Sequence, residues 1–135
     1  MPLTKYSDVD SKHLVGYIQP YRNKEKIAVF IFRKHSEMEK VLEIGCAACF
    51  VGFSEYKDDV IGGIFFSKKE LKLEYIIHEI SHATFHYMKI VKPKFFLGKA
   101  YSHLNKKDEY EERFCNTVGI ISGGIGEILN KHGYI

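Results

Sequence analysis

The sequence predicts a single α+β domain in which a small three-stranded sheet packs against two helices. Three observations predict this class. The chain has 135 residues, 45% of them hydrophobic, which suits one core. Runs of β-branched and aromatic residues of strand length lie in its first half, and apolar residues at three- and four-residue steps dominate its second half. No internal repeat or low-complexity linker divides residues 1–135, so we expect one domain.

Three segments have the composition of strands. Residues 26–33 (KIAVFIFR) are rich in β-branched and aromatic side chains and are bounded by polar residues on both sides. Residues 46–53 and 60–66 are two further apolar runs, joined by the polar turn at 54–59. We therefore predict a strand followed, after a short helix, by a β-hairpin.

The short helix between these strands is predicted by its ends. Ser36 and Glu39 have the S-x-x-E spacing of a capping box, and Gly45 stands where a C-terminal cap belongs. A second box, at Ser67 and Glu70, precedes the strongest helical pattern of the chain. That pattern consists of Leu73, Ile76, Ile77, Ile80, Ala83 and Tyr87.

The last two helices have predicted boundaries as well. Pro93 should stop the first of them at about Val91. Asn105 is a good N-cap for the second, and acidic residues fill its first two turns, where they suit the helix dipole. An apolar stripe from Phe114 to Ile125 continues this helix, and the glycines at 119–126 predict either close packing or a break.

Charge and composition exclude several classes of protein. The net charge is +3, and the lysines are scattered among acids, so we do not expect a nucleic-acid partner. The longest apolar run, residues 44–53, is too short to span a membrane, and residues 1–10 lack the apolar stretch of a secretory signal. We therefore expect a cytoplasmic protein. Its three cysteines give no disulfide framework, and Cys46 and Cys49 are interpreted as part of a packed strand.

The motif that carries chemistry lies on the strongest helix. His78-Glu79-Ile80-Ser81-His82 is an H-E-x-x-H sequence. Two histidines four residues apart differ by only about 40° around a helix, so both imidazoles can reach one ion. The glutamate between them can approach a water molecule bound to that ion. The spacing therefore predicts a zinc site with His78 and His82 as ligands.

This motif resembles that of the zincin metallopeptidases, and an acid-rich helix about thirty residues later narrows the resemblance to gluzincins. Their third zinc ligand is a glutamate on such a helix, in an E-x-x-x-D or, in small phage and ImmA/IrrE-like members, an E-x-x-x-N motif. Glu112 and Asn116 match E-x-x-x-N. The metzincin pattern needs a glycine and a third histidine after His82, and neither stands in register. The resemblance implies that residues 1–135 form one minimal zincin-like domain.

Glu112 is favoured as the third ligand because it shares a helix face with small residues, which would let the two helices approach closely. Glu111 is the runner-up because it lies nearer the apolar stripe of the same helix. Asn116 would then hydrogen-bond a ligand histidine and fix its tautomer.

The resemblance implies a zinc metallopeptidase that acts on a specific protein or peptide, with Glu79 as the general base toward a zinc-activated water. In gluzincins the strand before the motif helix pairs with extended substrate, and here this implies residues 60–66. Gly62 and Gly63 would permit close backbone approach there, or they mark only a bulge. An oxyanion donor is also expected, and His103 and Tyr101 are candidates, with His86 and Tyr110 as alternatives.

Alternatives remain for the motif itself. The two histidines could satisfy carbonyls within a core, or hold a purely structural zinc ion. The leading alternative function is a catalytically inactive zincin-fold binding module, such as a phage or mobile-element factor that acts on a host protein.

Overall fold

A computed structural model of the protein describes residues 5–43, 45–91 and 105–135. These residues form a four-stranded mixed sheet and three α-helices, so the α+β class is confirmed. The expectation of three strands is wrong, because Leu14–Ile18 forms an additional strand, β1, that pairs antiparallel with β2 (Lys26–Phe32). The five residues of β1 include Gly16, and so short a run gave no signal of its own.

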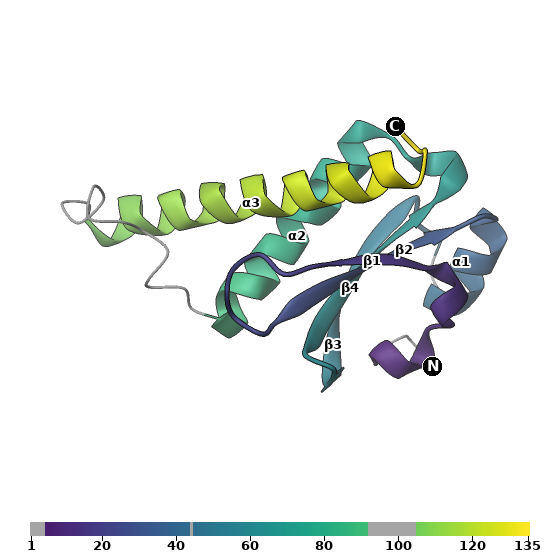
Figure 1. Ribbon diagram of the computed structural model, residues 1–135, viewed down its shortest axis with the longest axis horizontal. Helices are drawn as coiled ribbons and strands as arrows, with labels where there is room; N and C mark the ends of the chain where they lie inside the picture. The colour runs from purple at the N-terminus through teal and green to yellow at the C-terminus, as the bar shows by residue number, and fades with distance from the viewer. Residues whose placement is uncertain (1–4, 44, 92–104) are drawn as a thin grey trace.

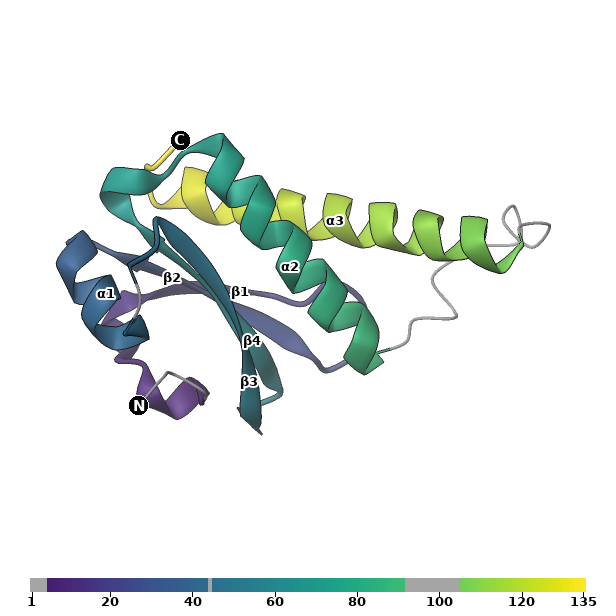
Figure 2. The same ribbon diagram turned by 180° about the vertical axis from the view of Figure 1, so that it is seen from behind.

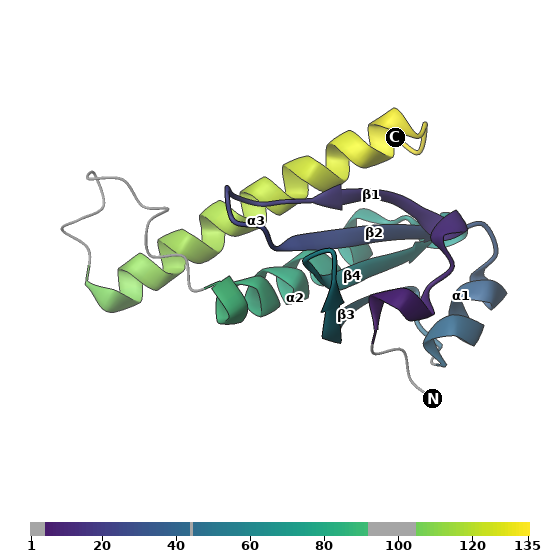
Figure 3. The same cartoon turned by 60° about the horizontal axis from the view of Figure 1, so that its bottom comes forward.

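The strands lie in the order β1-β2-β4-β3, as Figure 3 shows. The predicted hairpin is present as β3 (Ala48–Lys57) and β4 (Val60–Ser67), which pair antiparallel. On its other side β4 pairs in parallel with β2. Strand β4 is therefore an interior strand, and β3 forms one edge of the sheet.

Helices cover both faces of the sheet (Figures 1 and 2). The two long helices, α2 (Leu73–Val91) and α3 (Lys106–Lys131), lie on one face, with α2 over β3 and β4 and α3 over β1. Helix α1 (His35–Leu42) packs on the opposite face, against β2 and β4. The sheet is the middle layer of three.

Strand β2 shows why both faces must be covered. Its alternate residues point to opposite sides, as they do in any strand. Ile27, Val29 and Ile31 belong to the core under α2 and α3. Ala28, Phe30 and Phe32 belong to the second core, under α1. The apolar run that predicted this strand is therefore typical of a strand buried on both faces.

The ends of α1 differ from those predicted. The N-cap residue is Lys34, which makes no side-chain capping bond, and Ser36 lies inside the first turn. The helix ends at Glu43, which adopts a left-handed conformation (φ 58°), and not at Gly45. The capping-box and glycine-cap predictions for α1 are therefore wrong.

The segment before α2 is also more complex than predicted. Lys68–Glu70 forms one turn of 3₁₀ helix, and α2 itself begins at Leu73. Ser67 makes no capping bond; its hydroxyl lies 3.2 Å from Nδ1 of His35. Helix α2 is described as far as Val91, and the residues that follow, including Pro93, lie outside the described residues, so its predicted end stays a prediction.

Helix α3 begins as predicted and does not break. The side chain of Asn105 accepts a hydrogen bond of 2.8 Å from the backbone N–H of Asp108. The glycine segment stays helical, and Gly124 packs so tightly that an added Cβ would lie 3.0 Å from Cγ1 of Ile18. Close packing is therefore confirmed at this glycine. Within the described residues, no helix has both the length and the apolar character that crossing a membrane requires.

Candidate metal centre

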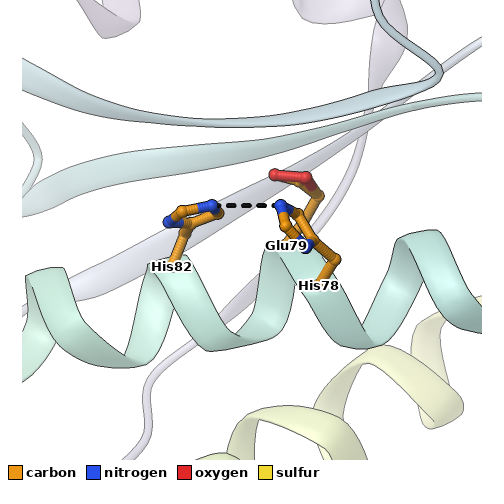
Figure 4. Close-up of side chains that lie close together, drawn as sticks. All are labelled: His78, Glu79 and His82. Carbon is orange, nitrogen blue, oxygen red and sulfur yellow. Dashed lines mark hydrogen bonds between the residues drawn. The ribbon is translucent and has the colours of Figure 1, made fainter.

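His78, Glu79 and His82 come together on α2, as Figure 4 shows. The Nε2 atoms of the two histidines lie 3.2 Å apart, and their rings meet edge to face with centroids 4.8 Å apart. Potential ligand atoms of all three residues lie within 4.8 Å of one another. No other group of three or more such side chains occurs in the part of the chain that the structure describes.

The rotation of α2 decides how these side chains are presented. Ile80, Ala83 and Tyr87 are buried in the core between α2 and the sheet, which fixes the inward face of the helix. The histidines are then left exposed on the outward side. Glu79 falls between the two faces and is only 6% exposed.

The buried carboxylate of Glu79 is held by the edge of the sheet. Its Oε1 accepts a hydrogen bond of 3.2 Å from the backbone N–H of Phe50, in β3. Burying a carboxylate without such a partner is costly, so this bond also fixes where the side chain points. Glu79 therefore stands between the imidazole pair and the edge strand.

The imidazole pair fits a zinc ion. Two nitrogens at the usual 2.0–2.1 Å from a tetrahedral zinc ion stand about 3.3 Å apart. The observed Nε2 to Nε2 distance of 3.2 Å matches this separation, which also suits a hydrogen bond between neutral rings. Both rings can therefore bind one ion with little movement.

Neither Glu112 nor Glu111 joins this group. The packing of α3 on α2 gives the reason. The two helices run antiparallel, and the rings of Phe85 and Phe114 meet with centroids 4.7 Å apart. His82 lies before Phe85 and Glu112 lies before Phe114, so the two diverge from this contact in opposite directions. At 1.5 Å per residue, the offset along the helices is roughly 7–8 Å.

The remaining candidates separate into those that the structure places and those that it does not. Asn116 is partly buried on α3. Its predicted hydrogen bond to one of the two histidines stays a prediction, because the Nε2 atoms of His78 and His82 face each other. Tyr101 and His103 lie outside the described residues. His86, an alternative candidate for the oxyanion donor, is partly buried, and its Nε2 donates to the carbonyl oxygen of Ile61 at 3.1 Å. Burial of this ring lowers the pKa of His86.

The prediction of residues 60–66 as the edge that receives substrate is wrong, because β4 has a neighbour on both sides. Gly62 and Gly63 make room for aromatic rings instead. An added Cβ at Gly62 would lie 2.7 Å from the ring of Phe50, and one at Gly63 would lie 3.0 Å from the ring of Phe65. The bulge interpretation is closer, since the pairing of β4 with β2 skips Ile61.

The two thiols of the C-x-x-C segment lie across the edge strand from the histidines. Cys46 and Cys49 pack with the core under α1, whereas Phe50 packs with the core under α2. Burial raises the pKa of both thiols, that of Cys49 to about 12, and the nearby charge of Glu79 adds to the rise. Both thiols are partly buried, and neither joins the group formed by His78, Glu79 and His82. Cys49 lies in β3 as predicted, whereas Cys46 lies before this strand, so the prediction is wrong for Cys46.

One contributor to this region cannot be found from the sequence. The amide of Phe50 acts through the backbone, which leaves no residue-type signal. Comparison of the chain with protein-family models, curated proteins and solved structures finds no match.

Proposed function

We propose that the protein is a zinc-dependent peptidase of a minimal gluzincin type. One observation carries the proposal: two Nε2 atoms stand at zinc-ligand separation, with a buried glutamate fixed beside them at the open edge of a sheet. A structural zinc site needs four closed ligands and has no use for that glutamate.

The residues have separate tasks in this proposal. His78 and His82 hold the ion through Nε2. A bound zinc ion supplies an acidified water molecule and polarises the carbonyl group that is attacked. Glu79 takes the proton from the water and passes it to the nitrogen of the leaving amine. Glu112 remains the predicted third ligand, and it would reach the ion only if α3 changed its position relative to α2, because α3 lies on the side of α2 opposite to the two imidazoles (Figure 4).

The edge strand β3 is the place where an extended substrate would bind. On the side away from β4, its only pairing within the described residues is a single bridge between Lys5 and Glu55, and one of its amides bonds Glu79. A peptide that adds to this edge gains main-chain hydrogen bonds and comes directly beside the proposed base.

The zinc site is tested first, by elemental analysis of the protein purified without added metal. We expect about one zinc ion per chain in the wild type and loss of zinc in His82→Ala. His132→Ala is the matched control, because His132 lies at the far end of α3 and bonds the carbonyl of Val15. Zinc retained in folded His82→Ala would contradict the site.

The catalytic role is tested with Glu79→Gln in the zinc-loaded protein and an unfolded protein such as casein as substrate. We expect the variant to keep its zinc and to lose about 10²–10⁴-fold in cleavage rate. Glu74→Gln makes the same change at an exposed position of α2 and should cleave normally. Equal cleavage by Glu79→Gln and the wild type would refute the role of Glu79. Zinc-loaded wild type that cleaves nothing would favour the binding module.

A further inference from the structure

A cavity lies near the proposed metal centre, between α1, the segment that leads into β3, and the start of α2. Its volume is about 330 Å³. Five side chains line it, together with Gly45 and Ala47: His35, Glu39, Cys46, Glu70 and Tyr75. We infer that this cavity receives a lysine or arginine side chain of the substrate, close to the bond that is cleaved. The inference rests on the proposed peptidase function and adds its substrate class.

The cavity is within reach of the proposed catalytic residues. Tyr75 stands one helical turn before His78 and Glu79, a distance of about 5.4 Å along α2. The other wall, residues 45–47, runs directly into β3, whose Phe50 amide holds Glu79. An extended peptide advances about 3.3 Å per residue. A side chain within about two residues of the cleaved bond can therefore enter the cavity.

The charge of the lining selects a cation. Glu39 and Glu70 contribute carboxylates, and the described residues that line the cavity include no lysine or arginine. Glu39 also holds His35, with Oε1 of Glu39 2.9 Å from Nε2 of His35. A side chain that carries an ammonium or guanidinium group can pair with these carboxylates, whereas an acidic side chain would be repelled.

The chain already places one ammonium group at the rim of this cavity. Nζ of Lys72 lies 3.8 Å from Oε2 of Glu70 and 5.6 Å from the ring centroid of Tyr75. A carboxylate and the face of an aromatic ring are the two groups that attract such a cation. The Lys72 side chain is 58% exposed and is held by no other ion pair in the described residues, so a substrate cation can displace it.

The inference is tested with acetylated, amidated alanine hexapeptides that carry a single Lys, norleucine or Glu at each position in turn. Cleavage is followed by mass spectrometry with the zinc-loaded wild type. Binding is measured separately with zinc-loaded Glu79→Gln, which does not depend on turnover. We expect Lys to be preferred over norleucine by about two- to fivefold at one position within two residues of the cleaved bond, and Glu to be disfavoured there.

Three variants assign the preference to the cavity. The double variant Glu39→Gln/Glu70→Gln should abolish the preference for Lys, and Lys72→Met should increase it by removing the competing ammonium group. Glu74→Gln is the control, because it removes one negative charge from exposed α2 beside Tyr75 without touching the cavity.

The outcomes separate this inference from the peptidase proposal. Equal binding of Lys and norleucine peptides at every position, or a preference that survives the double variant, would overturn the inference. Selective binding without cleavage by the wild type would support the cavity and refute the peptidase. Cleavage without a preference for Lys would support the peptidase and overturn the inference about the cavity.

Discussion

Glu79 is the residue on which the site depends. A carboxylate that is 6% exposed needs a hydrogen-bond donor, and the edge strand supplies it through the amide of Phe50. The same bond keeps the carboxylate beside the exposed imidazoles of His78 and His82. In the proposed peptidase, a base held in this way would lose little entropy when a substrate arrives.

The packed ring of His86 predicts how folding stability depends on pH. Its ring is packed against Gly52 and bonded to the carbonyl of Ile61, and burial, reinforced by Lys89, lowers the pKa of His86 in the folded state. The unfolded chain then binds more protons as the pH falls below about 6.5, so folding stability should decrease on acidification.

We expect urea unfolding of the metal-free protein to give a lower free energy of unfolding at pH 5.5 than at pH 7.5. His86→Gln keeps an N–H donor but does not titrate, so its dependence on pH should be flatter. The difference cannot exceed about 1.4 kcal/mol per pH unit, the limit for one proton. Identical slopes would show that His86 does not contribute.

At the scale of elements, the relation between α2 and α3 decides whether the zinc site has a third protein ligand. In the structure, Glu112 and His82 lie on opposite sides of the contact between Phe85 and Phe114, so Glu112 does not join the histidines. If zinc draws Glu112 in, Glu112→Gln should weaken zinc binding at least tenfold, and Glu111→Gln should leave it within about threefold. Competition with a zinc chelator measures both affinities. Unchanged affinity in both variants would remove α3 from the site.

Several local patterns predicted the local structure correctly, although the capping box and the glycine cap of α1 did not. The periodicity of α2, the Asn105 cap and the spacing of the H-E-x-x-H motif are all confirmed by the structure, because each is decided within one or two helical turns. Strand order is different. Nothing within residues 60–66 indicates that β4 pairs on both sides, because its neighbour β2 lies about thirty residues earlier in the sequence. The prediction that residues 60–66 form the edge strand is therefore wrong.

Neighbouring residues in the sequence do not show which glycine of α3 packs against the sheet. Gly119 and Gly124 give a matched pair of variants that tests this packing. An added Cβ at Gly119 meets nothing within 4 Å, whereas one at Gly124 would press on Ile18. Gly119→Ala should therefore raise the free energy of unfolding by about 1 kcal/mol, the helix-propensity difference. Gly124→Ala should gain less or destabilise the protein, and urea unfolding would compare the two. A larger gain at Gly124 would contradict the packing of α3 on β1.

For the whole molecule, the core and the metal centre are separate structures. Two hydrophobic clusters, one on each face of the sheet, hold the fold together, and the exposed histidines belong to neither. The chain should therefore fold without zinc, unlike a zinc finger, whose folding free energy comes from the metal. We expect the protein to keep its circular dichroism spectrum and a cooperative thermal transition after treatment with EDTA.

Zinc should nevertheless stabilise the folded protein by mass action, because only the folded chain brings the two Nε2 atoms to 3.2 Å. At a free zinc concentration of one hundred times Kd, the gain is about 2.7 kcal/mol, which corresponds to a rise in Tm of roughly 8–10 °C for a chain of this length. Calorimetry with buffered zinc should show this rise in the wild type and in Glu79→Gln, and none in His82→Ala. An apo protein that is unfolded at 25 °C would instead indicate that the ion is structural, and the catalytic proposal would lose its basis.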